Sequence, residues 1–143
     1  MTDVRRTFTV KQPPDKVVAY LKDFANTEQW DPGTVSTTRV GNGPIAVGTT
    51  WRNISEFRGR KTQLEYRLTR AESRRLTFVG KNKTATSTDD LNFREVDGGT
   101  EISYHAHFEF HGLAKLATPF LKAPLEKLGN DTERQMRETI NAL

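Results

Sequence analysis

The chain has 143 residues, 34% of them hydrophobic and 28% charged, which fits one folded domain with a single core and excludes a disordered chain. The absence of cysteine excludes disulfides and thiol chemistry, and no apolar run reaches the length of a membrane span. The net charge of +4 means that nucleic-acid binding has to be considered. We expect neither a secretory signal nor a membrane span, and therefore a cytoplasmic protein with one domain over residues 1–143.

The first 33 residues predict a strand followed by two helices. Thr7–Val10 alternates polar and apolar side chains, as a half-buried strand does, and a pair of prolines ends it. Apolar residues at helical spacing then predict a helix over residues 14–24, with proline in its first turn. Asn26 and Gln29 predict the cap and its partner at the start of a very short second helix.

Residues 34–111 predict an antiparallel meander. Helical periodicity disappears here, and segments of alternating polarity are separated by short turn sequences. One of these turns, Asp97-Gly98-Gly99, is a strong hairpin signal. The six predicted strands are Val35–Val40, Thr49–Phe57, Thr62–Arg70, Leu76–Lys81, Ala85–Glu95 and Glu101–Phe110.

The C-terminal segment predicts a long amphipathic helix. Apolar side chains recur at helical spacing over Leu113–Ile140 and form one stripe. We expect Pro119 and Pro124 to bend the first half of this helix. Gly129 with Asn130 predicts a break and restart.

This order of elements predicts an α+β fold in which a seven-stranded curved antiparallel sheet wraps around the terminal helix. The order, the segment Phe24–Gly33 with its Trp30-Asp31-Pro32-Gly33 turn, and the Pro-interrupted helix Gly112–Leu128 resemble the START-like superfamily, also called SRPBCC or polyketide cyclase/dehydrase-like proteins. The resemblance covers nearly the whole chain. It implies a helix-grip fold that holds a cavity between sheet and helix for lipids, polyketides or other hydrophobic molecules.

The strand pattern predicts which side chains face the interior. Because successive side chains alternate, Tyr104 and Phe108 share the inner face of the last strand while His105 and His107 face outward. The same phasing brings polar groups inward among aromatic ones, which is the composition of a ligand pocket. The candidate ligand-binding residues are Trp51, Asn53, Ser55, Phe57, Tyr66, Phe78, Asp89, Leu91, Tyr104, Phe108, Phe120 and Leu121. Phe120 and Leu121, from the C-terminal helix, would form the opposite wall of the pocket. The alternative is that they only pack in the core.

Asp89, Tyr66 and Tyr104 are the candidate catalytic residues. Burial raises the pKa of a carboxyl group, so an inward-facing Asp89 could act as a general acid or base. The alternative is that these groups only hydrogen-bond one another, since buried polar groups are nearly always satisfied. Trp30 is expected to pack as a plug against the sheet, with a place at the cavity mouth as the alternative.

The histidines offer little support for a metal site. His105 and His107 have a spacing that can bind zinc, but they share the outer face with glutamates and no third ligand has a recognisable spacing. We therefore expect surface histidines paired with acids, and no bound metal. The sequence also lacks a nucleophile elbow, a phosphate loop and a dinucleotide fingerprint, so we expect no cofactor.

Basic residues gather between Arg52 and Arg75, where eight Lys and Arg stand against three Glu. They fall on predicted strands, interleaved with acidic side chains and without an aromatic ladder on the outer face. A solvated surface is therefore favoured over a nucleic-acid site. Attraction of an anionic ligand, or peripheral contact with anionic lipid, lies between these two interpretations.

Three functional hypotheses follow. The first is binding of a hydrophobic small molecule, lipid-like or aromatic and polyketide-like, in the cavity. The second is a metal- and cofactor-independent enzyme similar to aromatic polyketide cyclases and dehydratases, in which pocket Tyr and Asp groups move protons. The third is a regulatory subunit that binds a partner protein through the basic outer surface. We expect a monomer or a weak homodimer.

Overall fold

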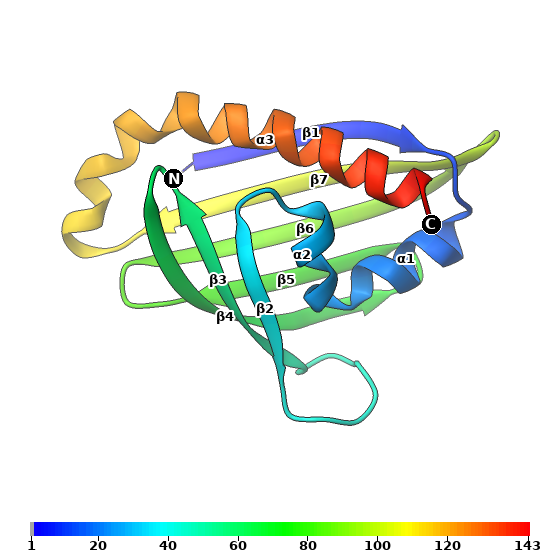
Figure 1. The fold of residues 1–143 in the computed structure, drawn as a ribbon, viewed down its shortest axis with the longest axis horizontal. Coiled ribbons are helices and arrows are strands. Elements are labelled where there is room, and N and C mark those ends of the chain that lie inside the picture. The colour runs from blue at the N-terminus through cyan, green and yellow to red at the C-terminus, as the bar shows by residue number, and fades with distance from the viewer. Residues whose placement is uncertain (1) are drawn as a thin grey trace.

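A computed structural model describes residues 2–143, so Met1 of the expected domain lies outside the described residues. One seven-stranded antiparallel sheet packs against a long C-terminal helix, which confirms the predicted α+β helix-grip architecture (Figure 1). The strands are β1 (Thr2–Val10), β2 (Thr34–Val40), β3 (Thr50–Phe57), β4 (Arg60–Glu72), β5 (Arg75–Lys81), β6 (Ala85–Val96) and β7 (Gly99–Phe110). The helices are α1 (Pro14–Lys22), the 3-10 turn η1 (Phe24–Asn26), α2 (Thr27–Trp30), the 3-10 turn η2 (Gly112–Ala117) and α3 (Thr118–Asn141).

The sheet is a meander closed at one side by the first strand. Its order is β1-β7-β6-β5-β4-β3-β2, so the N-terminal strand pairs with the last one. β1 starts earlier than the alternation of Thr7–Val10 predicts, because it pairs with β7 from Thr2↔Phe108 to Val10↔Thr100. Figure 1 shows α3 running along β1, with α1 close to the C-terminal end of this long helix.

The long helix lies close to β1 because of one glycine. A Cβ atom on Gly129 would come within 2.5 Å of Val4 Cγ1 and 3.0 Å of Arg6 Nη2. Arg6 then ties the helix to the strand, donating to the backbone oxygen of Glu126 at 2.8 Å and to the side-chain oxygen of Asn130 at 3.1 Å. Gly129 therefore marks a close approach, and the predicted break at this residue is wrong because α3 is continuous from Thr118 to Asn141.

Asn26 occupies the predicted N-cap position of α2, but its side chain makes no capping hydrogen bond, so the predicted pairing with Gln29 is wrong. Asp23 caps the short η1 turn, its side-chain oxygen accepting from the backbone N–H of Ala25 at 3.0 Å. Asn26 instead donates to the backbone oxygen of Tyr20 at 2.7 Å, and Gln29 accepts from the Tyr20 hydroxyl at 2.6 Å. Both side chains thus hold α2 against α1. Their spacing in the sequence is that of a capping pair, but their contacts are tertiary.

The packing of the interior changes from one end of the strands to the other. At the end covered by α1 and η1 it is a solid aromatic and aliphatic core, in which Phe24 stacks on Tyr66 and Phe78 with ring centroids 4.4 and 4.6 Å apart. Trp51 lies 5.9 Å from the same Phe24 ring and is fully buried. Trp30 is also buried, with its ring 6.2 Å from that of Tyr104, which matches the expected plug.

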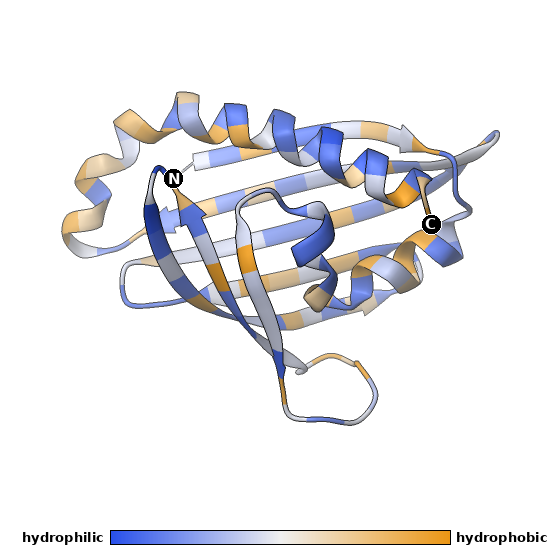
Figure 2. Cartoon of the chain, in the orientation of Figure 1, coloured by the Kyte–Doolittle hydropathy of each residue, from blue (hydrophilic) through white to orange (hydrophobic). Residues whose placement is uncertain are grey.

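The start of the C-terminal helical region, η2 and the first turn of α3, carries exposed apolar residues. Leu113, Leu116 and Phe120 belong to the predicted apolar stripe, yet 72–87% of each is exposed to solvent. They lie in η2 and the first turn of α3, which Figure 2 colours as largely hydrophobic. The stripe therefore becomes buried only from Leu125 onward, where α3 reaches the sheet.

Candidate functional site

A cavity of about 210 Å³ lies between the inner face of the sheet and the first half of α3. Strands β3, β4, β6 and β7 supply its floor, β1 one side, α3 its roof, and the turn after α2 its inner end. The roof is apolar, with Leu121, Leu125 and Leu128 spaced so that they share one face of the helix. On the floor, Phe57 and Phe108 extend this apolar lining.

One carboxylate of the cavity is strongly perturbed. Asp89 projects from the middle of β6, and only 6% of it is exposed. Burial raises the pKa of Asp89 to about 7, with a further rise from the charge of Asp31, while the Tyr104 hydroxyl lowers it by hydrogen bonding to the carboxylate. A carboxyl group with this pKa can take up or release a proton near neutral pH.

Tyr104 stands beside Asp89 on the neighbouring strand. Its pKa lies well above the ordinary tyrosine value, because burial and the nearby charges of Asp89 and Asp31 disfavour the phenolate. Tyr104 therefore stays protonated at all ordinary pH values. The pair offers a ligand one group that can exchange a proton and one hydroxyl, whose single hydrogen can be donated to Asp89 or to the ligand.

A second carboxylate, Asp31, lines the cavity from the turn after α2. Burial raises its pKa, and hydrogen bonds from the Thr34 hydroxyl at 2.8 Å and the Gly33 backbone N–H at 3.1 Å partly offset that rise. These bonds fix the Asp31 side chain in place. Two carboxylates near one apolar cavity compete for ionisation, so the charge of Asp31 favours the protonated form of Asp89.

Tyr66 reaches the same cluster because of a missing side chain. It pairs with Gly80 across β4 and β5, and a Cβ atom on Gly80 would come within 2.6 Å of the Tyr66 ring. The ring thus lies flat over the glycine. Burial and the charge of Asp89 raise the pKa of Tyr66, and hydrogen bonding with Ser87 opposes this rise.

The structure places seven of the twelve sequence-predicted binding residues on the cavity. All but one come from β3, β4, β6 and β7, in keeping with the predicted alternation of inward and outward side chains. The seven are Ser55, Phe57, Tyr66, Asp89, Tyr104, Phe108 and Leu121.

The other five lie elsewhere. Trp51, Phe78 and Leu91 are at most 1% exposed and pack in the solid end of the core, where Phe24 occupies the space a ligand would need. Phe120, expected on the opposite wall, is 74% exposed because it lies on the outward face of α3, before the helix reaches the sheet.

Asn53 belongs to a buried polar network and not to the cavity lining. Its amide donates to the hydroxyls of Thr37 at 2.9 Å and Thr34 at 3.2 Å, and it accepts from Ser55 at 2.6 Å. Thr37 also contacts the Thr27 hydroxyl at 2.6 Å, which joins β2 to α2. Asn53 therefore fits the alternative interpretation, in which inward-facing polar groups only hydrogen-bond one another.

The list of candidate residues leaves out some polar residues of the cavity, among them Ser87 and Asp31. The strand pattern does turn Ser87 inward together with Asp89, since both alternate with outward-facing residues on β6. Asp31 belongs to the Trp30-Asp31-Pro32-Gly33 turn, whose local pattern indicates only the end of a helix. No local pattern places this turn over the sheet, because its position depends on the packing of α2 against β2 and α3.

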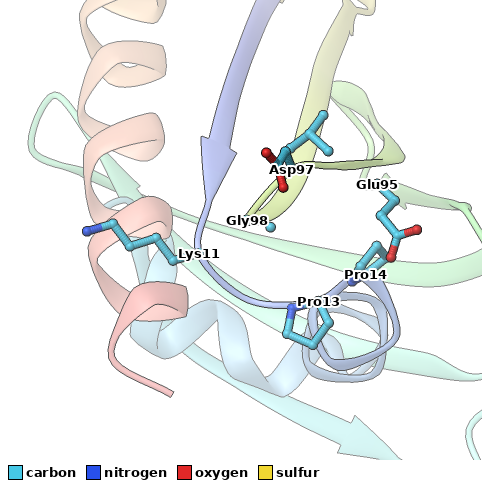
Figure 3. Close-up of a pocket in the computed structure, with 8 residues that line it drawn as sticks. Lys11, Pro13, Pro14, Glu95, Asp97 and Gly98 are labelled. Carbon is cyan, nitrogen blue, oxygen red and sulfur yellow. The ribbon is translucent and has the colours of Figure 1, made fainter.

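Two other surface features do not compete with this cavity. A hollow beside the β6–β7 turn is lined by turn residues, and Figure 3 shows Lys11 pointing away from Glu95 and Asp97, so no functional groups converge there. In the basic stretch over 52–75, Arg70, Arg74 and Arg75 form ion pairs with Glu72, Asp15 and Asp90. Within residues 2–143, no helix is both long and apolar enough to cross a membrane.

Comparisons with known proteins agree with this architecture. The family model described as polyketide cyclase/dehydrase and lipid transport matches residues 1–141. A search of curated proteins gave no match. Solved structures share the fold at low sequence identity.

Among these is TTHA0849 from Thermus thermophilus, 15% identical, with a TM-score of 0.81 and coverage of 98% of this chain and 97% of that one. The ZhuI aromatase/cyclase from Streptomyces sp. R1128 is 14% identical, with a TM-score of 0.75 over 98% and 91% of the two chains. A STAR-related lipid transfer protein from Xanthomonas axonopodis is 13% identical, with a TM-score of 0.73 over 95% and 84%. The chain therefore belongs to the polyketide cyclase/dehydrase and lipid transport family.

Proposed function

We propose that the protein binds a compact hydrophobic molecule carrying at least one polar group in the cavity between the sheet and α3. The observation that carries this proposal is the combination of an apolar roof from α3 with the Asp89, Tyr66 and Tyr104 side chains at the inner end of the same cavity. Apolar walls supply affinity, and a few fixed polar groups orient the ligand. Membership of the family supports a hydrophobic ligand but does not identify it.

The size of the cavity narrows the ligand class. Its volume of about 210 Å³ is below the roughly 300–1,000 Å³ typical of sites for drug-sized molecules. A small aromatic or polyketide-like ring system therefore suits it better than a lipid with two acyl chains. The proposed binding residues are the seven predicted ones on the cavity, together with Asp31, Ser87 and Leu125.

The exposed apolar segment is the proposed entrance. Leu113, Leu116 and Phe120 precede Leu121, the first residue of α3 that lines the cavity. A hydrophobic ligand can adsorb on these side chains before it moves under the helix. Lys115, exposed on the same segment, would favour an anionic ligand or an anionic lipid surface at this point.

A cavity-filling substitution tests the binding function. Ala106 lines the cavity from β7, next to Val4 and Leu125, and Ala106→Leu would fill part of the volume. We expect saturable binding of an apolar fluorescent probe to the wild-type protein, and affinity reduced about tenfold or more in the variant, since the loss of about 1.4 kcal/mol is one factor of ten. Ala142→Leu makes the same chemical change at an exposed position and should bind the probe as the wild type does. Equal affinities in all three proteins would reject the proposal.

Acid–base catalysis is the second candidate, and the perturbed Asp89 is the observation that favours it. In this alternative the Asp89 carboxylate accepts a proton from a carbon next to a carbonyl group, and Tyr104 donates a hydrogen bond to the oxygen that gains negative charge. Asp89 then returns the proton to a leaving hydroxyl group as water departs. Such a step needs no metal ion or organic cofactor.

Two conservative substitutions separate binding from catalysis. Asp89→Asn and Tyr104→Phe preserve shape but remove, in turn, the proton acceptor and the donor. If the protein is an enzyme, both variants keep probe affinity within a few fold while turnover of a polyketide-like substrate falls about a hundredfold or more. If the protein only binds, the wild type shows no turnover and the variants change affinity alone.

A further inference from the structure

The outer face of the sheet carries a cluster of three metal-ligating side chains, of which the sequence pattern indicates only two. His105 and His107 alternate on β7, so both rings lie on the outer face, with centroids 6.2 Å apart. Asp3 lies on β1 directly opposite His107 in the strand register. The expected pairing of these surface histidines with an acid is confirmed, and the acid is Asp3. No sequence spacing indicates this third side chain, because β1 pairs with β7 across more than a hundred residues of sequence.

The three side chains already converge on one point. His105 Nε2 lies 2.7 Å from Asp3 Oδ1, and His107 Nδ1 lies 2.8 Å from the same oxygen. The potential ligand atoms of the cluster all lie within 4.8 Å of one another. Among residues 2–143 no other three His, Cys, Asp or Glu side chains meet in this way.

We infer that Asp3, His105 and His107 bind one divalent transition-metal ion of the zinc type. Two imidazole nitrogens and one carboxylate oxygen form a ligand set that such ions take, with a further position left open. The zinc–ligand bonds of about 2.0–2.2 Å would place these atoms about 3.3 Å apart in a tetrahedral site. Asp3 Oδ1 therefore needs to move only about half an ångström away from each imidazole nitrogen. The two imidazole nitrogens, which now lie within 4.8 Å of each other, need to reach about the same 3.3 Å separation.

The surroundings favour a site of three protein ligands. Asp90, opposite His105 on β6, is held by Arg75 through two hydrogen bonds of 3.0 and 2.8 Å and by Thr77 at 3.0 Å. It is therefore engaged and does not turn toward the cluster. The side chains of His105, His107 and Asp3 remain 27–41% exposed, so water can occupy the open position.

Metal binding requires each histidine ring to free the nitrogen that faces Asp3. In the metal-free protein, His105 Nε2 and His107 Nδ1 can each carry a hydrogen and donate it to the Asp3 carboxylate. When the metal binds, that hydrogen moves to the other nitrogen of the same neutral ring, and the carboxylate supplies one negative charge. His105 would then bind through Nε2 and His107 through Nδ1, which is a specific difference between the two rings.

Calorimetric titration of the tag-free protein with Zn²⁺ tests this inference. We expect one equivalent bound by the wild type, with affinity lowered about tenfold or more in Asp3→Asn and His107→Ala. His111→Ala is the matched control, since His111 contacts Thr86 and lies outside the cluster. This control should keep wild-type affinity. Absence of wild-type binding, unchanged affinity in both cluster variants, or loss in the control alone would overturn the inference.

Nitrogen-15 NMR of the histidine rings gives a second, independent readout. We expect Zn²⁺ to shift the Nε2 signal of His105 and the Nδ1 signal of His107, and to leave both nitrogens of His111 unchanged. Co²⁺ in place of Zn²⁺ should show the absorption of a four-coordinate ion. Coordination through the opposite nitrogens, or shifts confined to His111, would contradict the proposed geometry.

Discussion

The two ends of the interior use the same strands but reach different outcomes. Each long strand sends large apolar side chains to the end under α1, where Phe24, Trp51 and Phe78 leave no cavity. Under the first half of α3 the same strands mix aromatic rings with small or polar side chains such as Ser87 and Ala106, and a cavity stays open there. Alternation along a strand is the same at both ends, so the size of the inward side chains and the element that covers them together separate the core from the cavity.

Truncation at the solid end should have the largest effect on stability. Trp51→Ala removes a fully buried indole that packs on Phe24 and Phe78, and we expect a loss of about 4 kcal/mol in the free energy of unfolding. Phe108→Ala, at the cavity, should cost about half as much, since that ring is partly exposed and faces open space. Chemical denaturation measures both. Equal losses would mean that the two ends do not differ as described.

A pH-dependent effect on stability is expected next in size. The pKa of Asp89 is raised to about 7 in the folded protein, against about 3.9 in an unfolded chain. Between these values the unfolded state loses its proton first, so the free energy of unfolding falls as pH rises through this window. Asp89→Asn removes that contribution.

The Asn variant should therefore match the wild type near pH 4 and exceed its stability near pH 8 by on the order of 4 kcal/mol. Denaturant titrations across this range measure the difference. A constant difference at all pH values would show that Asp89 has an ordinary pKa in the folded protein. A residual slope in the variant is expected from Asp31, whose pKa is also raised by burial.

A smaller effect is expected where the two ends meet. Gly80→Ala places a methyl group within 2.6 Å of the Tyr66 ring, which must move away from Ser87. We expect a loss of about 2 kcal/mol and weaker probe binding. Gly33→Ala is the stability control, because its nearest neighbour would lie at 3.7 Å. If both variants unfold alike, the flat packing of Tyr66 over Gly80 is not required.

The smallest effect on stability is expected at the proposed entrance. Leu116→Ala removes a side chain that is 72% exposed, so the free energy of unfolding should change by less than about 0.5 kcal/mol. The rate of probe uptake, measured by stopped-flow fluorescence, should nevertheless fall. An unchanged rate would place the entrance elsewhere.

Much of the fold could be predicted because period-two and helical patterns are local. The strand phase that turns Tyr104 and Phe108 inward and His105 and His107 outward is confirmed by the β1–β7–β6 register. The single α+β architecture follows from the order of these patterns.

The rest depended on contacts between distant segments. Gly129 has the local appearance of a helix break, and only its approach to Val4 shows why the helix is continuous there. Asp3 joins the histidines through strand pairing, and Asp31 enters the cavity through the packing of α2. No spacing within a single element carries such information.

Native mass spectrometry of the protein purified from its own host tests the proposed ligand cavity most directly. A small hydrophobic molecule should co-purify with the wild-type protein and with Ala142→Leu. It should be absent from Ala106→Leu, in which the cavity is partly filled. An adduct retained equally by Ala106→Leu, or bare protein in every case with no probe binding, would contradict a ligand site between the sheet and α3.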